Sequence, residues 1–430
     1  MLAGGEQEHH DTAVGNVLPC GSGADSARPP QRCVSTRRAT AGNFALFDYG
    51  FRPFFLLAGW FALLSVPAWL WLYRTGGTPL PGLPPQLWHG HEMLFGFVGA
   101  AIAGFMLTAV PSWTGSRGFA GRPLLALATT WLLGRFAFAF AAHLPQFLIV
   151  VAELAFIPAL LLLVAPPVLR SANRNRPLPF VLVTFWALDA AFLWAVHQGD
   201  AALARQMLLA TLGVVLLLIT VIGGRVVPAF TGNALRARGA DATLRTFPLV
   251  DRGVIAAMAA LALADLLRLP AVVPAGLAGI AAVLHAVRLS GWQTRHTLRD
   301  PIVWILHAAY AWLPLGLALR ALHALAGFGF AAHWLHALGI GAAAGMVLAV
   351  MTRAALGHTG RPLRAARATT VAYVLLIVAG LVRVFGPVAA PGSYVVSITL
   401  SAVAWTGAFL LFVLVYTPIL VRPRADGRPG

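Results

Sequence analysis

The sequence predicts an all-α membrane protein of about twelve transmembrane helices. Of its 430 residues, 59% are hydrophobic and only 10% are charged, a composition far outside the range of soluble proteins. Apolar segments long enough to cross a bilayer recur from residue 50 to the C-terminus. Arginines gather in every second loop between these segments, which supports an even number of helices.

Each helix is expected where an apolar segment lies between turn signals, because Gly and Pro are typical of helix ends. The expected spans are 50–73, 89–112, 124–142, 147–169, 178–197, 203–226, 252–268, 271–290, 301–323, 333–352, 368–386 and 394–420. They form one membrane domain at 43–421. Residues 1–42 are polar and rich in Gly, Pro and Ser, so we expect a disordered tail, and 422–430 form a short basic tail.

The basic residues predict the orientation of the chain. All 31 of them are arginine, and the loops on one side hold only Arg74, Arg205 and Arg268. By the positive-inside rule, the arginine-rich loops and both termini are expected in the cytoplasm. The net charge of +17 is then explained by topology and by contact with lipid headgroups of the bilayer. It does not indicate a nucleic-acid partner, since no segment is long enough for a basic folded domain.

Several classes of function are disfavoured by missing motifs. The sequence has no Walker A loop and no CxxCH motif, which argues against ATP-driven transport by this chain and against c-type haem. Cys20 and Cys33 both lie in the N-terminal tail, so we expect neither a disulfide framework nor a thiolate cluster.

A repeat of about 120 residues divides the membrane domain into three units of four helices. Prolines open helices 1, 5 and 9 at Pro53, Pro177 and Pro301. Thr-Gly dipeptides are expected to end helices 2, 6 and 10, at Thr114-Gly115, Thr231-Gly232 and Thr359-Gly360. Common turn chemistry is the alternative explanation. Three units in a ring would bring helices 2, 6 and 10 to equivalent positions around an axis.

Histidines mark the start of helices 2 and 10. His89 and His91 open the first of these, and His333 and His336 open the second. His91 and His336 lie equally far before a Thr-Gly dipeptide, so the repeat places them at one depth near the periplasmic side. His333 and His336 share one helix face. Because imidazole is a good ligand for zinc, copper and iron, we expect metal or haem binding here. The alternative is interfacial histidines that bond to loops.

A second group of histidines is expected toward the cytoplasm, at His285, His307 and His358. His307 lies among apolar and aromatic residues, where an unpaired polar group is costly, so it either bonds a carbonyl or binds a cofactor. His358 occupies the place of an aromatic residue in the other two Thr-Gly motifs, which favours a packing role.

Charged residues within the spans are few. Arg135 and Glu153 lie at similar depth on adjacent antiparallel helices, which predicts an ion pair, and Asp189 lies at the same level. Glu92 could accept the N–H of a metal-bound His91 and so determine its tautomer. A proton or substrate path is the functional interpretation of this polar layer, and structural pairing is the alternative.

Three segments resemble the NnrS family: FRPFF at 51–55, WHGHEM at 88–93 continuing to VPSWTG at 110–115, and TRAALGHTGRP at 352–362. The likeness extends from about residue 44 to the C-terminus. This resemblance implies a multi-pass protein of the bacterial inner membrane that contains haem and copper. It also implies a role in the response to nitric oxide and in protection against nitrosative stress.

The family is distantly similar to the catalytic subunit of haem–copper oxidases, which has a pseudo-threefold helical array. That similarity implies a b-type haem held axially by His91 and His336. The oxidase copper histidines lie on helices 6 and 7, and this chain has no histidine at 198–284. Copper would therefore need other ligands, either His89 with His333 or His285 with His307. Oxygen reduction by the oxidase mechanism is disfavoured.

Two hypotheses follow for the function. In the first, the chain binds haem and binds or turns over nitric oxide with an unidentified electron donor; an enzymatic activity would then be that of a haem-dependent oxidoreductase acting on nitric oxide. In the second, it is a transporter or metal-delivery protein whose histidines pass an ion through alternating access of the repeats.

Overall fold

The computed structural model describes residues 44–428 except 79–82 and 391. The regular secondary structure of this part of the chain is all helical, without strands, and confirms an all-α membrane protein. The expected disordered tail at 1–42 and its two cysteines lie outside the described residues.

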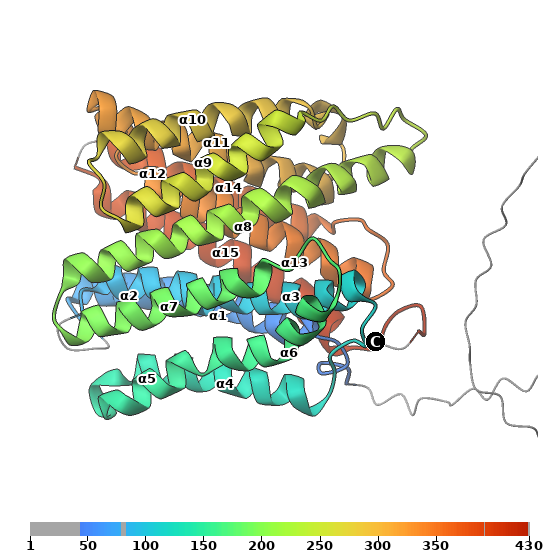
Figure 1. The fold of residues 1–430 in the computed structure, drawn as a ribbon, viewed down its shortest axis with the longest axis horizontal. Coiled ribbons are helices and arrows are strands. Elements are labelled where there is room, and N and C mark those ends of the chain that lie inside the picture. Colours follow the sequence, from blue (N-terminus) through green and yellow to red (C-terminus); the bar gives the residue numbers. More distant parts are fainter. Residues whose placement is uncertain (1–43, 79–82, 391, 429–430) are drawn as a thin grey trace, which may run out of the picture. The chain divides into compact units, whose positions relative to one another are not determined.

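Twelve helical rods cross the described domain, as predicted (Figure 1). Eight are single helices: α1 (Phe51–Thr75), α4 (Arg122–Ala139), α7 (Leu178–His197), α8 (Ala201–Arg236), α9 (Pro248–Leu266), α10 (Val272–Ser290), α11 (Pro301–Ala326) and α14 (Arg367–Ala389). A ninth, α15, spans Tyr394–Val421, and a tenth joins α5 (Gln146–Leu154) to α6 (Phe156–Arg170). The second rod joins α2 (Pro85–His91), the π-helix η1 (Glu92–Val98) and α3 (Gly99–Thr114). The corresponding rod of the third unit joins α12 (Trp334–His336), the π-helix η5 (Ala337–Ala344) and α13 (Gly345–His358).

Ten of the rods in the described residues are long and apolar enough to cross a membrane. The other two are α4 and α9, whose charges lower their apolar character. Arg135 lies within α4, and Asp251, Arg252 and Asp265 lie within α9. Both still pack as full-length members of the bundle, so the helix count inferred from the sequence holds.

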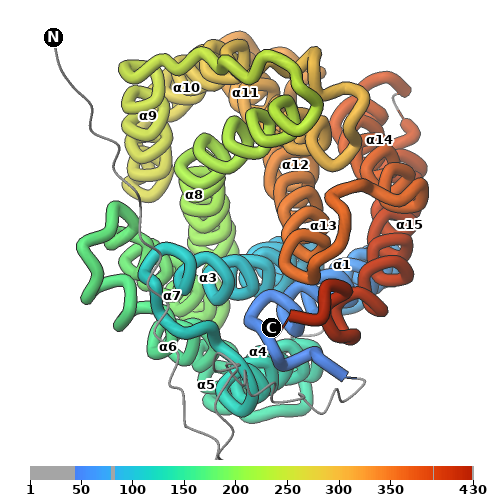
Figure 2. The backbone as a smooth tube through the Cα atoms, turned by 90° about the vertical axis from the view of Figure 1, so that its right-hand side faces the viewer, coloured from blue at the N-terminus to red at the C-terminus, as the bar shows by residue number. Residues whose placement is uncertain are grey.

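Three rods, one from each unit, line a shared interior, as the repeat predicts. Viewed end-on, α3, α8 and α13 face one another while the other helices lie around them (Figure 2). An apolar cavity of about 90 Å³ lies between them, with walls that include Ile102 of α3, Ile219 of α8 and Val350 of α13. Helices 2, 6 and 10 thus occupy equivalent positions around one axis.

The three Thr-Gly dipeptides lie at one end of the domain, the corner end. The opposite end is the pocket end. Each threonine donates to a carbonyl four residues earlier: Thr114 to Val110 at 2.8 Å, Thr231 to Val227 at 2.8 Å and Thr359 to Ala355 at 2.6 Å. The loop between α8 and α9 belongs to the corner end and lies at the right of Figure 1.

The expectation that Thr231-Gly232 ends helix 6 is wrong. Helix α8 continues through both residues to Arg236. By contrast, Gly115 and Gly360 both have a φ of 67°, a left-handed conformation that glycine adopts without a Cβ clash. Thr231 keeps its hydrogen bond inside the helix, and its hydroxyl is also engaged by His307 at 2.7 Å.

Two π-helical segments at repeat-equivalent positions distinguish the first and third units from the second. They begin directly after His91 and after His336, whereas α8 is α-helical throughout. A glycine in each segment allows close approach of an aromatic ring from the preceding rod. Phe61 lies against Gly96, and Trp312 lies against Gly341. Such π-segments are rare and are frequently found at functional sites.

The contact between Gly341 and Trp312 predicts a strong effect of an added methyl group. A Cβ on Gly341 would overlap the Trp312 ring, whereas one on Gly339 of the same segment would meet nothing within 4 Å. We expect Gly341→Ala to destabilise the protein by about 1–3 kcal/mol, because the ring and rod must shift. Thermal unfolding of detergent-purified protein measures this, with Gly339→Ala as the matched control. Equal melting temperatures for the two variants would contradict the packing described here.

Candidate functional site

A cavity of about 540 Å³ opens at the pocket end of the domain. Its walls come from α1, α2 and η1, α8, α12 and η5, α14 and α15. The lining is mostly apolar, with a few polar side chains that include His89, His333, His336, Arg205 and Arg383. This size and this mixture are typical of sites for small molecules and cofactors.

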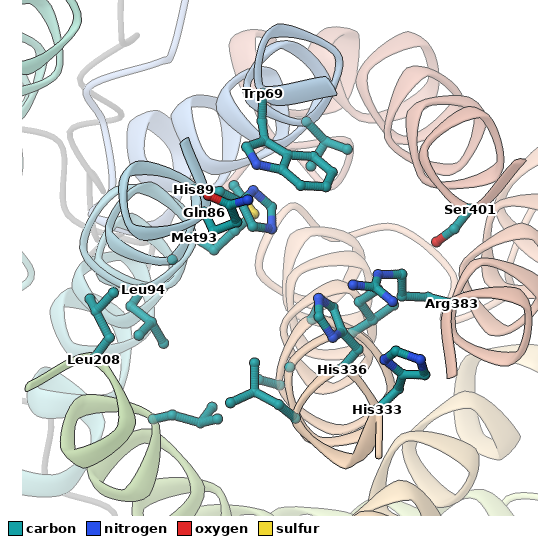
Figure 3. A pocket seen from close by; sticks show the side chains of 18 of the residues that line it. Trp69, Gln86, His89, Met93, Leu94, Leu208, His333, His336, Arg383 and Ser401 are labelled. Carbon is teal, nitrogen blue, oxygen red and sulfur yellow. The ribbon is translucent and has the colours of Figure 1, made fainter. Parts of the chain in front are cut away.

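His89 forms one wall of the cavity (Figure 3). Its ring lies on that of Trp69, with centroids 4.5 Å apart. Among the described residues, its Nδ1 atom is buried and has no hydrogen-bond partner, and the same is true of Trp69 Nε1. Buried polar atoms are almost always paired in native proteins, so such atoms facing a cavity indicate a ligand.

His336, His333 and Arg383 lie together on another wall, across the cavity from His89 (Figure 3). The His333 ring lies 6.0 Å from that of Tyr394, and Arg383 Nη2 donates to the Tyr394 hydroxyl at 3.3 Å. In the described part of the chain, Arg383 Nη1 is buried without a partner. A cationic group is therefore held beside two imidazoles at the wall of an apolar cavity.

His91 does not face this cavity, which corrects the expectation that it pairs with His336. Its ring is fully buried, and its Nδ1 and Nε2 atoms each lie 3.0 Å from a carboxylate oxygen, of Glu92 and Asp189 respectively. The ring also packs between Phe138 and Phe192, at centroid distances of 4.2 Å and 4.8 Å.

Helix geometry explains why His89, rather than His91, reaches the cavity. Two residues are separated by about 200° around an α-helix, so the two imidazoles leave α2 in nearly opposite directions. The carboxylates that attract His91 come from the first two units, Glu153 on α5 and Asp189 on α7. At the equivalent place in the third unit, His336 lies beside Arg383 instead.

A buried ion cluster surrounds His91. Arg135 donates to both Glu92 and Glu153, which confirms the predicted Arg135–Glu153 ion pair. Asp189 belongs to the same cluster, and Glu92 is bonded to His91 as expected. All five side chains are buried, so the polar layer anticipated from their depth is a single connected group.

The histidines nearer the corner end are satisfied by hydroxyl groups. His285 Nδ1 lies 2.8 Å from the Tyr310 hydroxyl, and its Nε2 lies 3.5 Å from Thr220 Oγ1. His307 bonds to two threonine hydroxyls, at 2.7 Å and 3.0 Å, rather than to a carbonyl. Each nitrogen of the two rings therefore has a hydroxyl group as its neighbour.

His358 and Arg383 show what the sequence did and did not indicate. The His358 ring stacks 6.1 Å from that of Tyr49, in agreement with the expected packing role. Arg383 was not predicted as a site residue. The sequence could have indicated it, because an arginine inside an apolar segment is a default candidate for function.

The chain was also compared with known proteins. Residues 45–424 match the NnrS protein family. No curated protein is significantly similar to the chain.

The ion cluster predicts a large loss of stability when its only arginine is removed. Replacing Arg135 with Gln leaves the carboxylates of Glu92 and Glu153 buried without their cation, at a cost of about 3–5 kcal/mol. The control is Arg238→Gln, which breaks a more exposed ion pair of 2.8 Å with Asp300 and should cost at most about 1 kcal/mol. Thermal unfolding compares the two. A melting temperature of Arg135→Gln no lower than that of the control would show that the cluster does not contribute to stability.

Proposed function

The chain belongs to the NnrS family, and from this premise we propose that it binds a b-type haem between His89 and His336 as part of a nitric oxide response. Family membership supports the association with nitric oxide. The haem assignment is supported chiefly by one observation, the imidazoles and orphaned polar atoms around the 540 Å³ cavity.

The residues of the cavity fit a haem. A macrocycle is flat and apolar and carries two carboxylates, so its site needs apolar walls, an axial imidazole and a cation. The cavity offers apolar walls such as Leu208 and Ile340, imidazoles on separate walls, and the guanidinium groups of Arg383 and Arg205. Without a CxxCH motif, the haem would be held by coordination alone.

In this proposal each side chain has a distinct task. His89 and His336 would hold the haem iron through their imidazole nitrogens, and Arg383 would pair with a propionate through the Nη1 atom that has no partner among the described residues. His333 borders the same cavity and is a candidate ligand for copper there. A haem iron with an open or labile axial position binds nitric oxide. Nitric oxide is small and uncharged, so it is compatible with the lipid and with the apolar lining of the cavity.

The first test is the haem content of two variants. We expect His89→Ala and His336→Ala to purify with strongly reduced Soret absorbance, because each removes an axial nitrogen. His143→Ala, an exposed histidine at the same end of the domain, is the control and should retain the haem of the unmodified protein. Addition of nitric oxide should shift the Soret band of the control.

Two results would contradict the assignment. Loss of haem in His91→Ala but not in His89→Ala would restore the pair expected from the repeat. A colourless unmodified protein would remove the haem proposal and favour a transporter or metal-delivery protein.

We also propose an inner-membrane location with the corner end in the cytoplasm. The loops at this end carry most of the arginines, whereas the pocket-end loops and adjoining turns hold little beyond Arg74, Arg205 and Arg268.

Reporter fusions test this orientation. A fluorescent protein that folds only in the cytoplasm should be bright after residue 430, and alkaline phosphatase should be active when inserted at 198–200, between α7 and α8. The reverse pattern would place the pocket on the cytoplasmic side.

A further inference from the structure

The ion cluster around His91 contains a second convergent set of ligand atoms, separate from the cavity. His91 Nε2 lies 3.0 Å from Asp189 Oδ1 and 3.6 Å from Glu153 Oε1, and the three residues offer ligand atoms within 4.8 Å of one another. All three side chains are buried. They come from α2, α5 and α7, which are distant in sequence, so the fold itself assembles them.

The hydrogen bond to Glu92 determines the state of the imidazole. His91 Nδ1 lies 3.0 Å from Glu92 Oε1, so Nδ1 donates its N–H there. In a neutral ring, Nε2 then presents a lone pair toward two carboxylate oxygens. Three acceptor atoms that face one another repel unless a proton or a metal ion lies between them. The two spacings from Nε2, 3.0 Å and 3.6 Å, are close to the ligand–ligand edges of about 3.0–3.5 Å expected around a metal with bonds near 2.1 Å.

The charges of the cluster are compatible with a divalent cation that takes the place of a proton on His91 Nε2. Glu92, Glu153 and Asp189 carry three negative charges, and Arg135 supplies one positive charge. With a neutral His91, two negative charges remain uncompensated in a membrane-spanning region, where isolated charges are costly. One divalent ion would neutralise the group.

A second observation concerns the other carboxylate oxygen of Glu153, on a side that His91 does not line. Glu153 Oε2 is buried and, among the described residues, has no hydrogen-bond partner. A space of about 10 Å³ adjoins it, lined by Glu153, Asp189 and Arg135 with surrounding apolar side chains. That is close to the smallest volume that holds one water molecule. The absence of a side chain at Gly134 keeps this space open, because its Cβ would lie 3.1 Å from Glu153 Oε2.

We propose that His91, Glu153 and Asp189 bind a divalent first-row metal ion. One imidazole and two carboxylates suit Zn²⁺, Mn²⁺ or Fe²⁺, whereas Cu⁺ prefers thiolate and thioether ligands. Glu92 orients the imidazole, as carboxylates commonly do for metal-bound histidines. The ion ties α2, α5 and α7 together behind the wall that carries His89.

The experiment measures metal content in the whole protein. The protein is purified, stripped with a chelator, exposed to Zn²⁺ or Mn²⁺, dialysed and analysed by mass spectrometry. We expect about one tightly held equivalent that Asp189→Asn and Glu153→Gln each weaken by at least tenfold. The control is Asp265→Asn, which removes a carboxylate paired with Arg320 outside the cluster and should leave metal binding unchanged.

The outcomes separate this site from the haem pocket. His89→Ala should lose haem and keep the divalent ion, and Asp189→Asn should do the reverse. Unmodified protein that fails to rebind Zn²⁺ or Mn²⁺ overturns the proposal, even if the variants do not fold. Equal metal content in Asp189→Asn and Asp265→Asn overturns it as well. If the metal lost from Asp189→Asn were copper, the proposed class of metal would be wrong.

Discussion

The interior of a bilayer offers no water, so each polar group on a membrane-spanning rod must be satisfied within the protein. This constraint explains the continuous helical backbone of the described domain and the threonines that bond to carbonyls of their own helices. It also explains why Arg135 lies between two carboxylates. Among the described residues, several buried polar atoms lack a partner, and those on His89, Arg383 and Glu153 lie beside the two proposed sites.

The rods were predictable because apolar length and the arginine loops are direct consequences of lipid and membrane potential. Their local irregularities were not. Helix α8 extends beyond Thr231-Gly232 because its residues keep bonding within the helix. The other two Thr-Gly dipeptides, although identical, lie at helix ends. The π-segments after His91 and His336 each place a glycine against an aromatic ring from another rod, a long-range contact that no local pattern records.

The candidate site was predicted in its residue types and depth, but only partly in its partners. Repeat equivalence pointed to His336, which lines the cavity. It could not show that carboxylates on α5 and α7 would draw His91 away, because that depends on which faces of distant helices meet. Arg383 was not predicted because the candidate site residues were all histidines, and a lone intramembrane arginine was given no role.

The uninterrupted α8 gives the domain a property that a perfectly repeated ring would lack. Two walls of the large cavity carry imidazoles, whereas α8 contributes Leu208, Leu209 and Leu212 together with Arg205 and no histidine. A symmetric ring would accept a planar guest equally well in three settings. Here the α8 wall offers no imidazole, so the departure from repetition in the middle unit gives the cavity chemically different sides.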